Sequence, residues 1–431
     1  MKNVYAILSV LFLVTAANAQ IINFPDPEFK AMLLQSGPNY AIAQNSSGTN
    51  IKIDTNNDFQ IQVSEALAVY KLYVTYNSVT NISGISYFTN LNRLECNNKD
   101  VAAIDVSGLT NLKYLKCTGN TSQTSLSIAG CTNLIEVYCT GDTMLTTLNA
   151  SGFTHLTTLE CSSCALTSVN VLGSSNLANF YCKNNQLTTL DVSNLQNLMW
   201  FDCSGNQLTS INLSGTNAGS FNCCNNQLTT LDLSSFTTMS SFGCCYNNLT
   251  TLDLSHLTAL GTISCEYNQL TSIAFPHSTA NMNIFCNNNQ LTNLDFSYLN
   301  KITYLDCSHN SLTNLDISGC YKLETPGQGD YPLDFSWNQT LISLNIKNGI
   351  RTLFTGTVLP NLRYLCRDLV EDPNSFTSAS VPASCVINSY CSYAPGGLFY
   401  TIQGETRYDS NSNGCDNLDV KMPRLKFGIS N

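Results

Sequence analysis

A repeat of about 21 residues runs through most of this chain. It is marked by a column of cysteines spaced 20 to 22 residues apart: Cys96, Cys117, Cys139, Cys161, Cys182, Cys203, Cys223, Cys244, Cys265, Cys286 and Cys307. Self-similarity at a fixed period of this length is typical of a solenoid, in which each unit packs only against its neighbours. Because one such unit cannot bury its own apolar row, the units are predicted to stack into a continuous array.

Each repeat alternates apolar and polar residues in two short runs. The first run ends at the column cysteine, as in Leu305-Asp306-Cys307, and the second follows a few residues later, as in Leu231-Asp232-Leu233. Alternation with a period of two indicates half-buried strands, and no 3.6-residue stripe lies between the runs. The sequence therefore predicts a β-rich solenoid with few helices.

The full unit reads L-x-x-L-x-C-x-x-N-x-L-T-x-L-D-φ-S, where φ is apolar, and it resembles a leucine-rich repeat with Cys in place of the third Leu. It is similar to secreted Cys-for-Leu repeat proteins of Bacteroidetes-type bacteria and, more distantly, to internalins. The resemblance implies a curved leucine-rich-repeat solenoid over residues 73–366, with a parallel sheet on its concave face. The first coil departs from the Cys form and carries Val74 in the ladder column.

Three columns of the unit are interpreted as structural. Parallel strands lie about 4.8 Å apart, so the column thiols are expected to stack inside as small, reduced hydrophobes. The Asn column is expected to satisfy backbone groups of the turns: Asn185, Asn206, Asn226, Asn247, Asn268, Asn289 and Asn310. The Asp column is expected to make turn hydrogen bonds rather than bind ions: Asp191, Asp232, Asp253, Asp295 and Asp316. Cys161 and Cys164 have a C-x-x-C spacing that also fits a redox or zinc pair, but a repeat variant with Cys164 in the Asn column is the favoured interpretation.

The first 19 residues have the features of a cleaved signal peptide. A positive start at Lys2 is followed by the apolar stretch 4–14 and by Ala17-Asn18-Ala19, an A-x-A cleavage signal. This pattern predicts a secreted or cell-surface protein. No later stretch reaches about 18 apolar residues, so no transmembrane segment is expected.

Residues 20–72 do not follow the repeat and are predicted to form a short helical cap. Segment 54–65 inside it fits a twelve-residue, EF-hand-like loop for Ca²⁺ in a stabilising role. The expected calcium ligands are Asp54, Asn56, Asp58, Gln60 and Glu65. Phe59 replaces the usual Gly of the sixth position, where a positive φ is costly for a bulky side chain. An Asx-rich turn is therefore the alternative interpretation.

The composition shifts again after Cys366. Residues 367–395 are predicted to be a connector, and residues 396–431 resemble the opening of the calcium-binding B-type repeats of bacterial adhesins. This resemblance implies a partial β-sandwich segment, with strands near 399–402 and 425–429, because a complete sandwich needs about 100 residues. An acid-rich loop supplies its expected calcium ligands: Asp409, Asn411, Asn413, Asp416 and Asp419. The cysteines expected to form disulfides, in undetermined pairs, lie outside the ladder: Cys366, Cys385, Cys391 and Cys415.

Charge and motifs exclude several functions. The net charge is −10, with 19 Lys and Arg against 29 Asp and Glu and no basic cluster, which argues against nucleic acid as a partner. The four histidines fall at different repeat positions, and no H-E-x-x-H, G-x-S-x-G or P-loop motif occurs. The chain is therefore not expected to be an enzyme.

The outward strand positions beside the cysteine column are predicted to bind an extracellular protein or glycan on the concave face. The expected contact residues combine aromatic rings with carboxylates: Tyr114, Tyr138, Tyr181, Trp200, Asp202, Tyr246, Glu266, Tyr267, Phe285, Tyr304 and Asp306. The alternative role for the aromatic residues is cross-strand stabilisation of the sheet.

The function expected is thus non-catalytic recognition or adhesion by a monomer. The alternatives are a structural spacer that presents a further C-terminal module, a hydrolase accessory, and an ice-binding protein. Ice binding would use a column of threonines: Thr188, Thr209, Thr229, Thr250, Thr271, Thr292 and Thr313.

Overall fold

The computed structural model describes residues 20–74, 78–97, 100–323, 332–352, 354–355, 359–369, 381–389 and 391, together with 407–408 and 420–421. By its contacts the chain divides into two compact units, Met1–Cys391 and Ser392–Asn431. The first unit contains the repeat array, and the array is a parallel β-solenoid of the leucine-rich-repeat type, as predicted.

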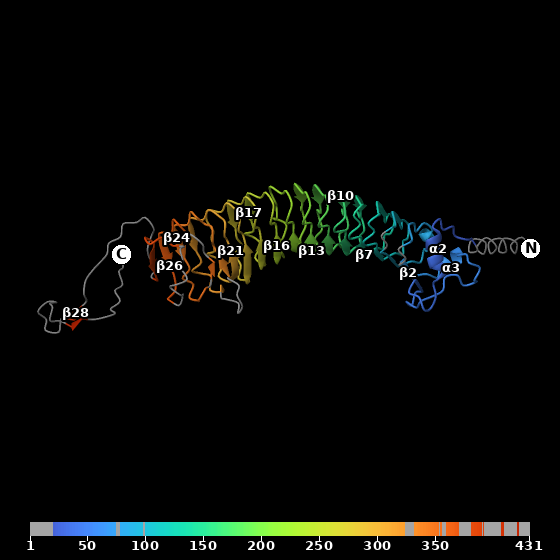
Figure 1. Ribbon diagram of the computed structural model, residues 1–431, viewed down its shortest axis with the longest axis horizontal. Helices are drawn as coiled ribbons and strands as arrows, with labels where there is room; N and C mark the ends of the chain where they lie inside the picture. Colours follow the sequence, from blue (N-terminus) through green and yellow to red (C-terminus); the bar gives the residue numbers. More distant parts are fainter. Residues whose placement is uncertain are drawn as a thin grey trace, which may run out of the picture. The chain divides into compact units, whose positions relative to one another are not determined.

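One 15-stranded sheet runs along the solenoid. In spatial order its strands are β1 (Ala43–Gln44), β2 (Lys71–Val74), β3 (Arg93–Cys96), β5 (Tyr114–Lys116), β7 (Glu136–Tyr138), β9 (Thr158–Glu160), β11 (Asn179–Tyr181), β13 (Leu198–Asp202), β15 (Ala218–Asn222), β16 (Ser241–Gly243), β18 (Thr262–Ser264), β20 (Met282–Phe285), β21 (Ile302–Asp306), β23 (Leu333–Asp334) and β25 (Phe354–Thr355). All neighbours pair in parallel except β1 and β2, which are antiparallel. Figure 1 shows this sheet along the concave edge of the solenoid.

A second row of short strands follows the opposite, convex edge, where Figure 1 labels β10 and β17. Its parallel groups are β4 (Ala103–Asp105) with β6 (Ser125–Ser127), β8 (Thr147–Asn149) with β10 (Ser168–Asn170), β12 (Thr189–Asp191) with β14 (Ser210–Asn212), β17 (Thr251–Asp253) with β19 (Ser272–Ala274), and β22 (Asn314–Asp316), β24 (Ser343–Asn345), β26 (Tyr364–Cys366) and β27 (Val386–Asn388) in one run. Because β27 pairs in parallel with β26, this row continues into the segment predicted to be a connector.

The core lies between the two rows and repeats from coil to coil. The cysteines of the ladder column are fully buried and unbridged, as predicted, and Val74 pairs with Cys96 in the same column. Two residues before the cysteine, a second buried column holds Leu, Val, Ile or Phe. Phe180, Phe201 and Phe221 stack there with ring centroids 5.6 and 4.9 Å apart. Such offset stacks add about 0.5–1.5 kcal/mol each beyond the burial of apolar area.

The Asn column closes the turn after each strand, as predicted. Asn206 Nδ2 donates to the carbonyl oxygens of Cys182 and Cys203, both at 3.0 Å, and its Oδ1 accepts from Leu187 N–H at 3.0 Å. The same contacts recur at the other asparagines of the column: Asn185, Asn226, Asn247, Asn268, Asn289 and Asn310. One side chain thus joins two coils and satisfies buried backbone groups that would otherwise cost about 1–3 kcal/mol each.

Two coils depart from this column. Asp142 and Cys164 occupy the Asn position in the described coils of Cys139 and Cys161, and the sequence has Lys99 at this position after Cys96, outside the described residues. Cys164 Sγ donates to the Cys139 carbonyl at 3.0 Å, so the thiol replaces one of the two amide contacts. Its thiol neighbour is Cys139 of the preceding coil rather than Cys161, and this contact lowers the pKa of Cys164. The C-x-x-C spacing therefore reflects a repeat variant.

The N-terminal end is covered by α2 (Pro27–Leu34) and the short helix α3 (Val63–Ala66), with a 3₁₀ turn at Ile85–Tyr87 in the first coil. Asp26 caps α2 by accepting from the N–H groups of Glu28 and Phe29. Its second oxygen accepts from Thr80 and Asn81 of the first coil. Burial alone would raise the pKa of Asp26, but these hydrogen bonds outweigh burial and lower the pKa. The carboxylate therefore fastens the cap to the solenoid.

Two disulfides occur in the described part of the chain. Cys366–Cys391 joins two of the four cysteines predicted to form bridges, with Cα atoms 5.2 Å apart. Cys385 is free, and Cys415 lies outside the described residues. The second disulfide, Cys224–Cys245, was not predicted and links neighbouring coils beside the ladder, with Cα atoms 4.5 Å apart.

The second unit is described only at β28 (Arg407–Tyr408) and β29 (Val420–Lys421), which pair antiparallel. The signal peptide, the strands predicted near 399–402 and 425–429, and the five calcium ligands predicted between 409 and 419 lie outside the described residues. No helix within the described ranges is long and apolar enough to cross a membrane.

Candidate functional site

The concave sheet gathers most of the residues predicted to contact a partner. The strand residues Tyr114, Tyr138, Tyr181, Trp200, Asp202, Phe285, Tyr304 and Asp306 occupy outward positions of β5 to β21. Glu266 follows two residues after β18, at the end of the strand. Tyr246 and Tyr267 lie in the turns, two residues after the ladder cysteines Cys244 and Cys265. The predicted contact residues therefore lie on one face of the solenoid, but their surroundings differ along that face.

On strands β3 to β9 the outward side chains pair with one another. Arg93 contacts Glu95 at 2.6 Å and lies over the ring of Tyr114 at 3.6 Å. Tyr138 donates its hydroxyl to Glu136 at 2.8 Å, and burial together with that carboxylate raises the pKa of Tyr138 to about 12. Arg93, Glu95, Glu136 and Tyr138 at this end of the face therefore already have partners in the protein itself.

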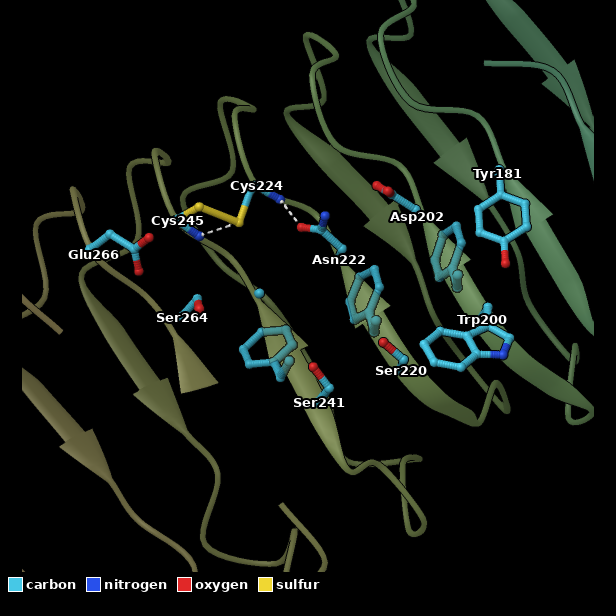
Figure 2. Close-up of a pocket in the computed structure, with 14 residues that line it drawn as sticks. Tyr181, Trp200, Asp202, Ser220, Asn222, Cys224, Ser241, Cys245, Ser264 and Glu266 are labelled. Carbon is cyan, nitrogen blue, oxygen red and sulfur yellow. Dashed lines mark hydrogen bonds between the residues drawn. A yellow bond between two sulfur atoms is a disulfide. The ribbon is translucent and has the colours of Figure 1, made fainter. Parts of the chain in front are cut away.

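A hollow interrupts the face at strands β15, β16 and β18. Its floor consists of small residues where other coils carry large ones: Ser220, Ser241, Gly243 and Ser264. Its volume is about 350 Å³. Figure 2 shows Tyr181, Trp200 and Asp202 at one end and Glu266 at the other, with the serines between them. We use "the hollow" for this floor and its two ends.

The walls of the hollow are held in place by the fold. The Cys224–Cys245 disulfide forms part of its rim. Gly243 keeps the floor open, because a Cβ there would lie 3.1 Å from Asn222 Oδ1 and 3.2 Å from Cys224 Sγ. Both distances are tighter than ordinary contacts, so a larger residue would have to displace its neighbours.

Among the described residues, no Lys or Arg forms an ion pair with the carboxylates around and beyond the hollow. Burial raises the pKa of Glu266, and the charge of Asp306 adds to that rise. Burial also raises the pKa of Asp306, although hydrogen bonds from Ser308 act in the opposite direction. Glu266 Oε2 is buried and makes no hydrogen bond. This end of the face therefore carries negative charge that the protein does not balance.

The turn two residues after the ladder column adopts a left-handed conformation in coil after coil. Gly, Asn or Ser fills this position in most coils, but four coils carry aromatic rings there: Tyr246, Tyr267, His309 and Trp337. Tyr246 and Tyr267 stack with centroids 4.3 Å apart, and His309 and Trp337 with centroids 5.3 Å apart. Bulky residues are uncommon at positive φ. His309 and Trp337 were missed in the sequence, although their spacing from the ladder column would have identified them.

The loop at residues 54–65 closes through its own hydrogen bonds. Glu65 accepts from the N–H groups of Thr55 and Gln62, and Asp58 accepts from Gln60 N–H. Phe59 does adopt a positive φ, of 63°, with its ring 73% exposed. No group of three or more His, Cys, Asp or Glu that could hold a metal ion occurs among the described residues. The backbone at Phe59 therefore suits a calcium loop, whereas the carboxylates are used as in an Asx-rich turn.

No family model matches the sequence, and no curated protein matches it. Solved structures that are similar include the functional domain of InlJ from Listeria monocytogenes, whose description includes a cysteine ladder. That match has 22% identity and a TM-score of 0.38, and it covers 71% of this chain and 70% of that chain.

Two further matches are an internalin, inlF, from Listeria monocytogenes and a leucine-rich-repeat protein from Leptospira interrogans. The internalin has 17% identity and a TM-score of 0.46, covering 84% of this chain and 95% of its own. The Leptospira protein has 16% identity and a TM-score of 0.38, covering 76% and 97%.

Proposed function

We propose that this chain is an exported, non-catalytic recognition or adhesion protein that binds an extracellular protein or glycan on its concave face. The observation that carries the proposal is the hollow, an opening with aromatic and carboxylate ends in the middle of a long sheet. Solenoids commonly use such concave surfaces for binding. Exposed aromatic side chains with polar neighbours are the residues that contribute most to protein interfaces. Trp200 is 53% exposed at the edge of this opening.

The threonine column fits recognition better than ice binding. The hydroxyls of Thr209, Thr271 and Thr313 each lie within hydrogen-bond distance of the carbonyl of the threonine in the preceding coil. Hydroxyls used in this way are less free to order water on a flat outer surface. A thermal-hysteresis measurement on the full chain is expected to show none.

The test of the proposed function blocks the hollow without disturbing the core. The full chain is screened against arrays of extracellular proteins and glycans. Ser241→Trp, on the floor, is compared with Ser255→Trp, at an exposed turn on the convex edge. We expect array ligands of the wild type to be lost with the first variant and kept with the second. Equal binding by both variants would show that the binding site lies outside the concave face. If neither the wild type nor the variants bind any ligand on the arrays, the role of a structural spacer is favoured.

We also propose that the loop at 54–65 binds Ca²⁺ as a stabilising ion, through Asp54, Asn56, Asp58, Gln60 and Glu65. The positive φ of Phe59 supports this, because the loop's sixth position requires it. The test is the thermal midpoint of the full chain with added Ca²⁺ and with a chelator. A midpoint that rises with Ca²⁺ in the wild type but not in Glu65→Gln supports the ion, and identical midpoints contradict it.

A further inference from the structure

The hollow is long and shallow enough to hold an extended side chain rather than a bulky group. Neighbouring coils lie about 4.8 Å apart, so three coils with only small outward residues leave an opening of roughly 14 Å along the solenoid. Trp200 closes one end of it and Glu266 the other. An occupant that lies along the floor would therefore contact the Trp200 indole at one end and the Glu266 carboxylate at the other.

The strands that form the hollow and follow it carry charge of one sign. Strands β13 to β25 contain no Lys or Arg, whereas Asp202, Asp306 and Asp334 lie on them. In the part of the chain that the structure describes, the one ion pair is Arg93–Glu95, at the opposite end of the face. A cation brought to this region would therefore find carboxylates that no protein cation already neutralises.

Glu266 provides an independent sign of a missing donor. Its Oε2 is buried without a hydrogen-bond partner, and a buried carboxylate oxygen in that state is costly. Glu266 as a whole is only partly buried, so a turn of its carboxylate toward the hollow would let a ligand that donates hydrogen bonds and carries positive charge remove this cost. Guanidinium suits the role best, because its planar fork can donate two parallel hydrogen bonds to one carboxylate.

We propose that the hollow receives an arginine side chain from an extended segment of a protein partner, with its guanidinium on Glu266 and the adjoining segment across Trp200. The proposal rests on the proposed function and names the partner chemistry of the same site. A protein segment is favoured over a glycan because the unbalanced carboxylates select charge, whereas glycan hydroxyls would not.

The test uses Trp200 as its reporter. The chain has two tryptophans, so Trp337→Phe leaves Trp200 as the single indole. This full-chain variant is titrated with the peptide Gly-Gly-Arg-Gly-Gly, blocked at both ends, and with the same peptide carrying citrulline, which is neutral but nearly isosteric. We expect a saturable change in Trp200 fluorescence with the arginine peptide and at least tenfold weaker binding of the citrulline peptide.

Variants then assign the contact. Glu266→Gln is expected to weaken the arginine peptide at least tenfold, while Asp253→Asn, an exposed carboxylate on the convex edge, leaves binding unchanged. Unfolding midpoints verify that both variants are folded. Equal affinity for the arginine and citrulline peptides, or full affinity in Glu266→Gln, would overturn the arginine assignment.

The array experiment separates this inference from the proposed function. If Ser241→Trp abolishes binding of a glycan or a non-basic protein while the arginine peptide never binds, the concave site stands and the arginine proposal fails. If the arginine peptide binds and Ser241→Trp abolishes that binding, both stand.

Discussion

The coils before Cys182 and the coils from Cys182 onward have the same repeat, but they differ in their Asn column and in the partners of their outward side chains. Before Cys182, the Asn column is broken by Asp142 and Cys164, while the outward side chains pair with each other, as Arg93 does with Glu95. From Cys182 to Cys307 the Asn column is complete, yet no Lys or Arg in the described part of the chain forms an ion pair with the outward carboxylates.

The contrast shows that the interior and the face of a solenoid vary independently. A complete set of asparagine contacts stabilises each turn from within, so the outward positions of the same coil can carry carboxylates that form no ion pair within the described part of the chain. Where the outward groups satisfy one another, little is left for a partner. We therefore expect binding to concentrate in the C-terminal coils and the weakest interior contacts to lie in the N-terminal ones.

The largest effect should come from removing one amide of the complete column. Asn226 donates to the carbonyls of Cys203, Cys223 and Cys224 and accepts from Leu208 N–H. Asn226→Ala leaves several of these groups buried without partners, so the free energy of unfolding should fall by about 3–5 kcal/mol. Urea denaturation measures this fall. The exposed neighbour substitution Gln227→Ala should change it by less than about 0.5 kcal/mol, and equal losses in the two would refute the role of the column.

The next effect concerns the disulfide at the rim of the hollow. Cys224–Cys245 closes a loop with a sequence separation of 21 residues, which should contribute about 3 kcal/mol. The paired change Cys224→Ser with Cys245→Ser should lower the urea midpoint accordingly. A reductant should lower the wild-type midpoint further than that of the double variant, since Cys366–Cys391 remains in both. If reductant shifts both by the same amount, the bridge does not stabilise the array.

A smaller effect, this time a gain in the free energy of unfolding, is expected where Asp142 interrupts the Asn column. Asp142 is buried, its Oδ2 has no hydrogen bond, and burial raises the pKa of its carboxyl from 3.8 to about 8. The folded state therefore binds a proton that the unfolded state releases above about pH 4, so this group makes stability fall as pH rises from about 4 to about 8.

Asp142→Asn removes that dependence and restores the amide donors. The free energy of unfolding should rise by about 1–3 kcal/mol at pH 8, with a much smaller difference at pH 4. Urea titrations of both proteins at several pH values give the comparison. A constant difference across that range would show that the carboxyl does not titrate as inferred.

The smallest effect belongs to the self-paired end of the face. Arg93 and Glu95 are both partly exposed, so their ion pair should contribute about 0–1 kcal/mol and weaken with salt. Arg93→Met removes the charge and with it both the ion pair and the guanidinium contact on the Tyr114 ring. Its unfolding midpoint should differ slightly from the wild type at low salt and match it at high salt. A loss that persists at high salt would indicate packing rather than charge.

The repeat made the fold predictable from sequence, because the cysteine spacing determines which residues pair. The period of two also placed Trp200 and Asp202 outward on one strand, and the structure brings them to the same end of the hollow. The hollow itself was not predicted, since it depends on small residues in three successive coils rather than on any conspicuous one. The Cys224–Cys245 bridge was not predicted, because it lies outside the repeating cysteine column, although residues next to Cys223 and Cys244 must face away from that column and on the same side.

The uniform register of the ladder has a further consequence for how such a chain can change. From Cys182 to Cys307 each coil offers its neighbour the same cysteine, apolar and asparagine contacts, so duplication or loss of one segment of about 21 residues there would leave every remaining interface of the same kind. The outward residues would shift by one rung relative to one another. Gain or loss of a coil near β16 would therefore lengthen or shorten the hollow while the interior stayed matched, which gives this architecture a way to alter its specificity by copy number alone.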